Sequence, residues 1–85
     1  MKVLYFGGLR AAIGIGEEDV SPPAGTATLA QLAEWLKTRS PKHEAAFSRS
    51  KLIRAAINQD FAPMDRSFAA TDEIAFFPPV TGGAA

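Results

Sequence analysis

The 85-residue sequence contains no cysteine and only one histidine, His43. Without cysteine, neither a disulfide framework nor a thiolate zinc site can compensate for a small core, so packing alone must stabilise the fold. His43 stands between Lys42 and Glu44, and in so polar a stretch we expect a solvated side chain rather than a metal ligand or a base. The sequence therefore predicts no metal site and no active site of its own.

An excess of charge of either sign is also lacking. Nine Lys and Arg residues balance nine Asp and Glu residues, and this zero net charge removes the electrostatic footprint of a nucleic-acid binder. No apolar stretch approaches the roughly 20 residues that a membrane helix needs, and the opening MKVLYFGGLR lacks the apolar core of a signal peptide. We expect a cytoplasmic protein that binds a small molecule or another protein, but neither nucleic acid nor membrane.

Five short strands are predicted within one domain. A chain of this length cannot be divided into two cores, and a hydrophobic content of 47% with 21% charged residues argues against wholesale disorder. Runs of β-branched, aromatic or alternating apolar residues indicate strands over residues 2–6, 17–21, 52–58, 61–64 and 73–77. Pro63 interrupts the fourth of these strands, which is tolerable only at the edge of a sheet.

One main helix is predicted between the second and third strands. Apolar side chains recur at helical spacing at Leu29, Leu32, Ala33 and Leu36. Thr28 and Gln31 match a capping box at the start, and Pro41 disfavours helical geometry in the residue before it, so the helix should span residues 29–39. Residues 43–49 suit a further short helical turn.

The loop between the first two strands is rich in glycine. Gly7-Gly8 is expected to break regular structure, so that residues 2–6 and 17–21 form a hairpin with a long loop. The segment GIGEED, residues 14–19, lacks the third glycine of a dinucleotide loop and would present acids to a phosphate. Its three acidic residues are predicted to form a solvated strand edge.

These elements predict an α+β fold, with a mixed sheet of four to five strands and one main helix across one face. The other face is left uncovered. If Ile74 and Phe76 face the helix, alternation sends Phe77 to the uncovered face, where it would form an apolar patch with Phe6 and Phe61. The alternation is equally compatible with Phe77 merely covering the edge of the sheet.

The chain ends FFPPVTGGAA, residues 76–85. Pro78-Pro79 would stiffen the exit from the last strand, and two glycines without side chains suit a narrow channel. A rigid proline segment followed by two residues without side chains is suited to insertion into the active site of another protein. We therefore predict a single domain over residues 1–85 with residues 78–85 as a projecting tail, and a frayed terminus is the alternative.

Several stretches resemble the small subunit of molybdopterin synthase, a ubiquitin-like sulfur carrier. These stretches are KVLYFGGLR, TLAQLAEWL, KLIRAAINQ, DEIAFFPP and FFPPVTGG, and the resemblance covers nearly the whole chain. The resemblance implies a β-grasp fold without a permanently bound cofactor, in which the carboxylate of a terminal glycine undergoes the chemistry. An E1-like adenylating enzyme activates this carboxylate with ATP, and a sulfur donor protein then converts the acyl adenylate to a thiocarboxylate.

The resemblance also implies roles for individual residues. Gly83 would carry the sulfur, and Gly82, which also has no side chain, would precede it in the tail. The tail enters the large subunit of a heterotetrameric synthase, where the sulfur passes to cyclic pyranopterin monophosphate. The residues that match the family's partner-binding positions are Phe6, Arg10, Phe61, Phe77, Pro78, Pro79 and Val80.

Ala84 and Ala85 depart from the family's pattern, in which the second glycine is the terminal residue. They place Gly83 in an ordinary peptide bond, so the resemblance implies that a protease removes both alanines before activation. Two alternatives remain open. Instead of a sulfur carrier for molybdopterin synthase, the chain is either a ubiquitin-like interaction module that docks without being activated, or a carrier for another pathway such as that of thiamine.

Overall fold

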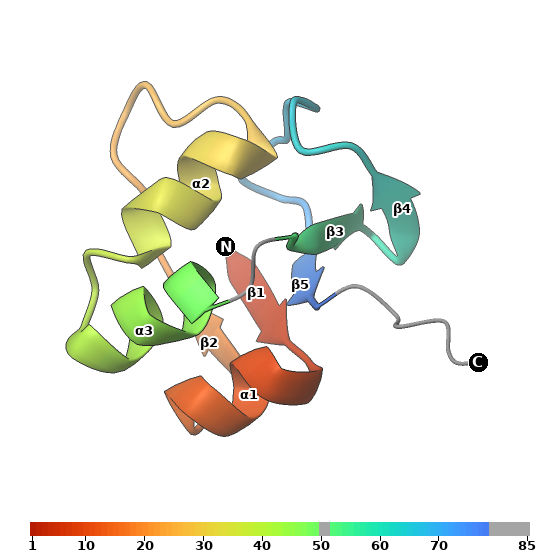
Figure 1. Cartoon of the computed structure of the whole chain (residues 1–85). Helices are drawn as coiled ribbons and strands as arrows, with labels where there is room; N and C mark the ends of the chain where they lie inside the picture. Colours follow the sequence, from red (N-terminus) through yellow and green to blue (C-terminus); the bar gives the residue numbers. More distant parts are fainter. Residues whose placement is uncertain (50–51, 79–85) are drawn as a thin grey trace.

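The computed structural model describes residues 1–49 and 52–78 (Figure 1). Its elements are β1 (Lys2–Tyr5), α1 (Gly7–Ile13), β2 (Glu17–Asp19), α2 (Leu29–Leu36), α3 (Pro41–Arg49), β3 (Arg54–Ile57), β4 (Asp60–Ala62) and β5 (Ile74–Phe77). The five strands form one sheet in the order β2-β1-β5-β3-β4. β1 and β5 pair in parallel, and the other neighbouring strands pair antiparallel. The predicted α+β fold with a mixed sheet is confirmed.

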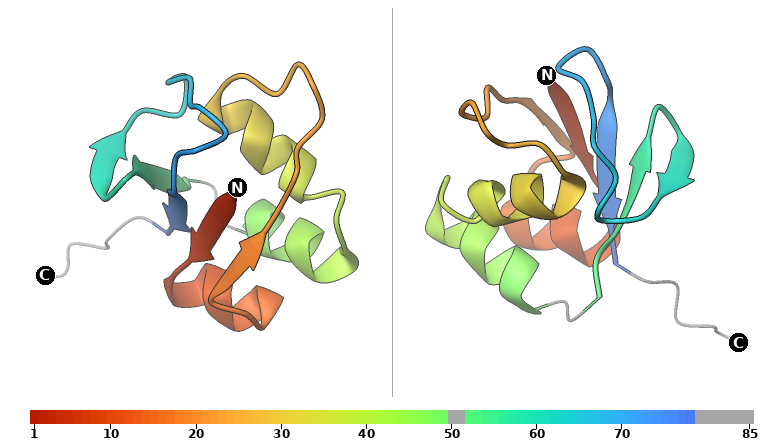
Figure 2. Two further views of the ribbon diagram at one scale, coloured as in Figure 1. Left: turned by 180° about the vertical axis from the view of Figure 1, so that it is seen from behind. Right: turned by 90° about the horizontal axis from the view of Figure 1, so that it is seen from above.

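The helices lie on one face of this sheet and leave the other face bare, as the right-hand view of Figure 2 shows. We call the covered side the inner face and the bare side the outer face. The largest fully buried side chains are Val3, Tyr5, Leu29, Leu32, Leu36, Ile74 and Phe76. The prediction of one covered and one bare face is confirmed, although three helices rather than one provide the cover.

The α2 helix begins as predicted and ends earlier. The Thr28 hydroxyl accepts a hydrogen bond from the Gln31 backbone N–H, and the Gln31 side chain accepts one from the Thr28 N–H, which completes the capping box. At the other end, the N–H groups of Thr38 and Arg39 donate to carbonyls three residues back, so the last turn tightens. The helix therefore stops at Leu36 instead of continuing to residue 39.

The α1 helix was not predicted, because Gly7-Gly8 suggested a break in regular structure. Gly7 does end the strand, with φ at +58°, but the helix starts directly at this residue. Leu9 and Ile13 are one turn apart and both buried, and Gly14 closes the helix in the left-handed conformation with its N–H on the Arg10 carbonyl. The predicted long hairpin loop between β1 and β2 thus contains a helix, although the antiparallel pairing of the two strands is confirmed.

The strands are slightly shorter than predicted, and the β3–β4 hairpin shows why. Asn58 and Gln59 both have positive φ, and Ile57 pairs with Asp60 across them, so the loop has two residues. β4 ends at Ala62, because Pro63 has no N–H to continue the ladder. The prediction that β4 lies at the edge of the sheet is confirmed.

His43 is buried, so the prediction of a solvated side chain is wrong. Its Nε2 lies 2.6 Å from Oε2 of Glu18, and the Tyr5 hydroxyl donates to the same oxygen at 2.5 Å. The Ser40 hydroxyl lies 2.7 Å from His43 Nδ1 and accepts a hydrogen bond from the His43 backbone N–H at the start of α3. Glu18 pairs with Val3 in the sheet and therefore points to the inner face, which also corrects the prediction that all three acids of β2 are solvated.

The contacts of Glu18 set the charge state of this cluster. Burial acts to raise the pKa of Glu18, but hydrogen bonds from Tyr5 and His43 and the nearby charges of His43 and Arg39 outweigh it, so the pKa lies below its ordinary value. Burial raises the pKa of Tyr5, and the hydrogen bond to Glu18 raises it further. Glu18 is therefore a carboxylate at neutral pH, and Tyr5 is a neutral donor.

Replacing Glu18 tests this cluster. In Glu18→Gln, the loss of a charged acceptor should lower the free energy of unfolding at pH 7 by about 1 to 3 kcal/mol. Because the folded state depresses the pKa of Glu18 below 4.5, its stabilisation is present above that pH and is lost as the pH falls through the folded value. Urea unfolding at pH 7 and pH 3 should show the difference from the parent shrinking in acid.

The control for this prediction is Glu17→Gln, which removes the neighbouring exposed carboxylate from the outer face. It should change the free energy of unfolding little at either pH. A Glu18→Gln deficit that is equal at both pH values would contradict the role assigned to the charge.

Candidate docking surface

Alternation along β5 determines which of its side chains lie on the outer face. Ile74 and Phe76 are fully buried on the inner face, so Phe77 points to the outer face, as predicted. β5 lies between β1 and β3, so the alternative that Phe77 merely covers an edge of the sheet is wrong. Ala75 of β5 and Ala56 of β3 are directly paired on the outer face. Their side chains are small, so they project little from the middle of this face.

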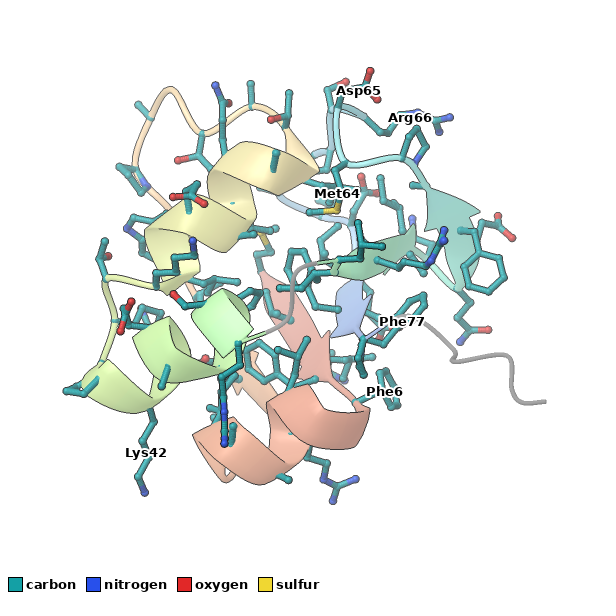
Figure 3. All side chains as sticks on the ribbon, viewed as in Figure 1. Phe6, Lys42, Met64, Asp65, Arg66 and Phe77 are labelled. Atoms are coloured by element: carbon teal, nitrogen blue, oxygen red, sulfur yellow. The ribbon has the colours of Figure 1, made fainter. Side chains whose placement is uncertain are left out.

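Phe6, Phe61 and Phe77 form an aromatic patch on the outer face. The Phe6 N–H donates to the Phe76 carbonyl at 3.1 Å, which places Phe6 beside Phe77, as Figure 3 shows. The rings of Phe61 and Phe77 have centroids 5.7 Å apart. Phe61 is 83% exposed and Phe6 is 46% exposed. The structure thus brings together the three phenylalanines that the sequence analysis singled out, and leaves their apolar surface open.

A hollow of about 730 Å³ adjoins the aromatic patch on the side of β3 and β4. Phe61 and Phe77 form part of its wall, and the rest includes Leu52, Arg54, Pro63 and Met64. Leu52 is 64% exposed although it is a large apolar side chain. Exposed apolar surface gathered in this way marks interaction sites in proteins.

Gly7 and Pro78 meet where the chain leaves the sheet. A Cβ atom on Gly7 would lie 3.1 Å from Cγ and 3.2 Å from Cδ of the Pro78 ring, so the absence of a side chain at Gly7 lets the ring pack closely there. Gly7 also adopts a φ of +58°, which favours glycine. The start of the tail is therefore held against the β1–α1 turn, directly beside Phe6.

Arg10 is exposed on α1, one helical turn beyond Phe6. Its backbone N–H donates to the Phe6 carbonyl, but its guanidinium lies against the loop at Gly16, where a Cβ would be 3.1 Å from Arg10 Cζ. The structure therefore places the backbone of Arg10 one turn from Phe6 but its guanidinium at the Gly16 loop. Its role as a polar contact for a partner stays a prediction.

Charges are unequally distributed over the outer face. At the β2 edge, Glu17 faces Lys2 at 3.8 Å, and Asp19 pairs with the amino group of Met1 at 2.8 Å. At the other side, Arg54 stands directly opposite Phe77 and forms no ion pair with any residue of segments 1–49 and 52–78. A cation without an internal partner thus lies next to the apolar hollow.

Sequence reasoning missed Arg54 and Leu52 as members of this surface. Alternation along residues 52–58 already grouped them on one face, but only the antiparallel register of β3 with β5 puts that face beside Phe77. The predicted tail residues Pro79, Val80, Gly82 and Gly83 lie outside the described residues.

The described residues offer a candidate binding surface. In segments 1–49 and 52–78, no group of His, Asp or Glu side chains is arranged to hold a metal ion. None of the helices there is long and apolar enough to cross a membrane. The features that stand out are the aromatic patch, the hollow and the anchored base of the tail.

Comparisons with known proteins match this chain over almost its full length. The model of the ThiS family matches residues 3–83. The molybdopterin synthase sulfur carrier subunit of Escherichia coli is 36% identical and that of Haemophilus influenzae 37% identical, each match covering 98% of this chain and 99% of the relative. The crystal structure of SAMP1 from Haloferax volcanii superposes with a TM-score of 0.73 at 30% identity and 98% coverage of both chains. The chain belongs to the ThiS family and shares the β-grasp fold of ubiquitin-like sulfur carriers.

Proposed function

We propose that this protein is the sulfur carrier subunit of a molybdopterin synthase. The observation that carries the proposal is the almost full-length match to subunits of that name, and the ThiS family model extends as far as Gly83. The anchored base of the tail and the aromatic patch support it, because both lie where a partner would receive the end of the chain. The reaction and its partners are placed in the cytoplasm, where ATP is available.

The chemistry resides in the carboxylate of Gly83. An E1-like adenylating enzyme joins this carboxylate to AMP and releases pyrophosphate from ATP. A sulfur donor protein then delivers sulfur at the oxidation level of sulfide, and this sulfur displaces AMP: a carbon–sulfur bond forms, the bond between the acyl carbon and AMP breaks, and a thiocarboxylate remains. This gives a nucleophilic sulfur to a chain that has no cysteine. In the large synthase subunit, the sulfur is transferred to cyclic pyranopterin monophosphate.

Ala84 and Ala85 must be absent when this chemistry takes place. In the 85-residue sequence Gly83 is joined to Ala84 by a peptide bond, so its carboxyl group is not free to react with ATP. The family match ends at Gly83, which supports removal of the two alanines by a protease. Gly82 and Gly83 carry no side chains, so this end of the tail fits a channel that is only as wide as a backbone.

The described residues contribute to docking. The aromatic patch of Phe6, Phe61 and Phe77 supplies the apolar anchors that dominate protein interfaces. Pro78 lies against Gly7 and fixes where the tail starts. The large subunit would cover the patch while Pro79 and Val80 lead the diglycine into its active site.

A second candidate is an interaction module that docks through the same patch and is never activated. The observation that favours it is the peptide bond after Gly83, since docking needs no free carboxylate. A carrier that serves another pathway, such as that of thiamine, would use the same chemistry with a different acceptor. The following experiments separate these possibilities.

Replacing Phe77 with Asp tests docking. If Phe77 is a buried anchor in the complex, the change should weaken binding to the large subunit by about 2 to 4 kcal/mol, while the partly exposed site in the free protein leaves the fold intact. Calorimetric titration and thermal melting measure the two effects. Ala45→Asp is the control, because it adds the same charge to an exposed position of α3 and should leave both unchanged. A large drop in melting temperature, or unaltered binding, would remove Phe77 from the docking surface.

Ending the chain at Gly83 tests the carrier chemistry. The stopped chain should form an acyl adenylate and then a thiocarboxylate with the activating enzyme, ATP and a sulfur donor. The 85-residue chain should form neither, because its Gly83 carboxyl is in a peptide bond. Mass spectrometry follows both products. If the stopped chain stays unmodified while it still binds the large subunit, the interaction-module function is supported instead.

Gly83→Ala in the stopped chain tests the narrow channel. One methyl group beside the reactive carbon should slow thiocarboxylate formation and sulfur transfer, because the channel admits little more than backbone. Thermal melting should not change, since the last strand of the sheet ends at Phe77, earlier in the chain. Equal rates for the Gly and Ala forms would show that the end of the tail does not pass through a tight channel.

A further inference from the structure

We infer that Arg54 and the hollow beside it form a second docking element, which receives a segment of the large subunit carrying an apolar side chain next to a carboxylate. The inference rests on the proposed function, because it extends the surface that the aromatic patch begins. The docking surface formed by the aromatic patch carries no charge of its own. The second docking element adds a charged contact on the side of the patch next to β3 and β4.

The position of Arg54 is fixed by the sheet. It pairs with Phe77 across β3 and β5, and directly opposed residues of an antiparallel pair carry their side chains on the same face. Arg54 is exposed, and it forms no ion pair within segments 1–49 and 52–78. Its guanidinium is therefore available beside the ring that we propose as the central anchor.

The hollow provides the apolar half of the site. Leu52, Pro63 and Met64 line it together with Phe61 and Phe77, so it is continuous with the aromatic patch. Leu52 is 64% exposed and Phe61 is 83% exposed in the free protein. A protein segment that covers the aromatic patch and reaches past Phe77 would bury these side chains as well, which stabilises the complex.

Charge identifies the kind of occupant. Among the described residues that line the hollow, Arg54 is the only charged one, so the site suits one carboxylate beside an apolar side chain better than a phosphate, which attracts several donors. Glu17 and Asp19, at the β2 edge of the outer face, have cations close by. No Asp or Glu is among the described residues that line the hollow, so a carboxylate of the partner would meet Arg54 without facing an acidic group there.

A second copy of this chain fits less well. In a two-fold contact through the hollow, each copy presents the same surface to the other. The two Arg54 side chains would then approach each other, and like charges at an interface oppose association. The hollow is therefore assigned to a different protein.

The test is charge reversal, with binding measured at low and high salt. The chain stopped at Gly83 and its Arg54→Glu variant are titrated with the large subunit at 50 mM and 500 mM NaCl. Arg54→Glu should weaken binding at low salt by about tenfold or more, and the difference should shrink at high salt, because a rim charge acts through a screened interaction. Lys42→Glu is the control: it makes the same charge change on α3, far from Phe77 in Figure 3, and should bind like the parent.

Leu52→Ser tests the apolar half in the same titration. It should weaken binding equally at both salt concentrations, because the loss is one of apolar burial. Thermal melting checks that each variant folds, and the exposure of both side chains predicts that it does.

The outcomes separate this inference from the proposed function. If the parent binds and Phe77→Asp weakens binding, but Arg54→Glu binds like the parent at low salt, only the inference is overturned. A loss in Arg54→Glu that does not depend on salt also overturns it, since the contact is then not one of charge. Self-association of the parent that disappears in Leu52→Ser would assign the hollow to a second copy. If the parent does not bind the large subunit at all, the proposed function fails first.

Discussion

The parallel pairing of β1 with β5 is the constraint on which the rest of the structure depends. It brings the first and last strands together at the centre of the sheet, with Tyr5 beside Phe76 on the inner face. Because both strands run in the same direction, the residues that follow Tyr5 and Phe76, namely Phe6 and Phe77, lie at the same end of the sheet and on its outer side. The helices lie over the inner face (Figure 2) and bury its side chains, whereas no described helix covers the outer face. The tail begins at this point, next to the aromatic patch.

The sequence was most informative where local chemistry alone determines structure. Thr28 and Gln31 predicted the start of α2, and strict alternation in IAFF predicted that Phe77 points away from the core. It was least informative where pairing between distant strands decides the outcome. His43 looked solvated because its neighbours in sequence are charged, yet the register of β2 brings Glu18 to it across the inner face. The sequence does contain a signal for the missed helix α1. Leu9 and Ile13 are apolar residues one helical turn apart, and Gly14, which follows them, is a common residue at helix ends.

The proposed chemistry explains why so small a chain needs no catalytic group of its own. Its contribution is to present a backbone carboxylate at the end of a segment whose start is fixed, with Pro78 packed against Gly7. Stability comes from the apolar inner face and from the cluster around Glu18, both on the opposite side of the sheet from the docking surface. The phenylalanines of the aromatic patch and Arg54 are not members of the core cluster, so they can be changed without disturbing the core.

The central claim is that Gly83 carries sulfur on its carboxyl group, and the intact mass of the native protein tests it most directly. The protein would be purified from its own cells during synthesis of the molybdenum cofactor and measured without prior chemical treatment. The account predicts a chain that lacks Ala84 and Ala85, with a fraction in which one oxygen of the terminal carboxylate is replaced by sulfur. A native chain that retains both alanines, in cells whose cofactor synthesis depends on this protein, would contradict the account.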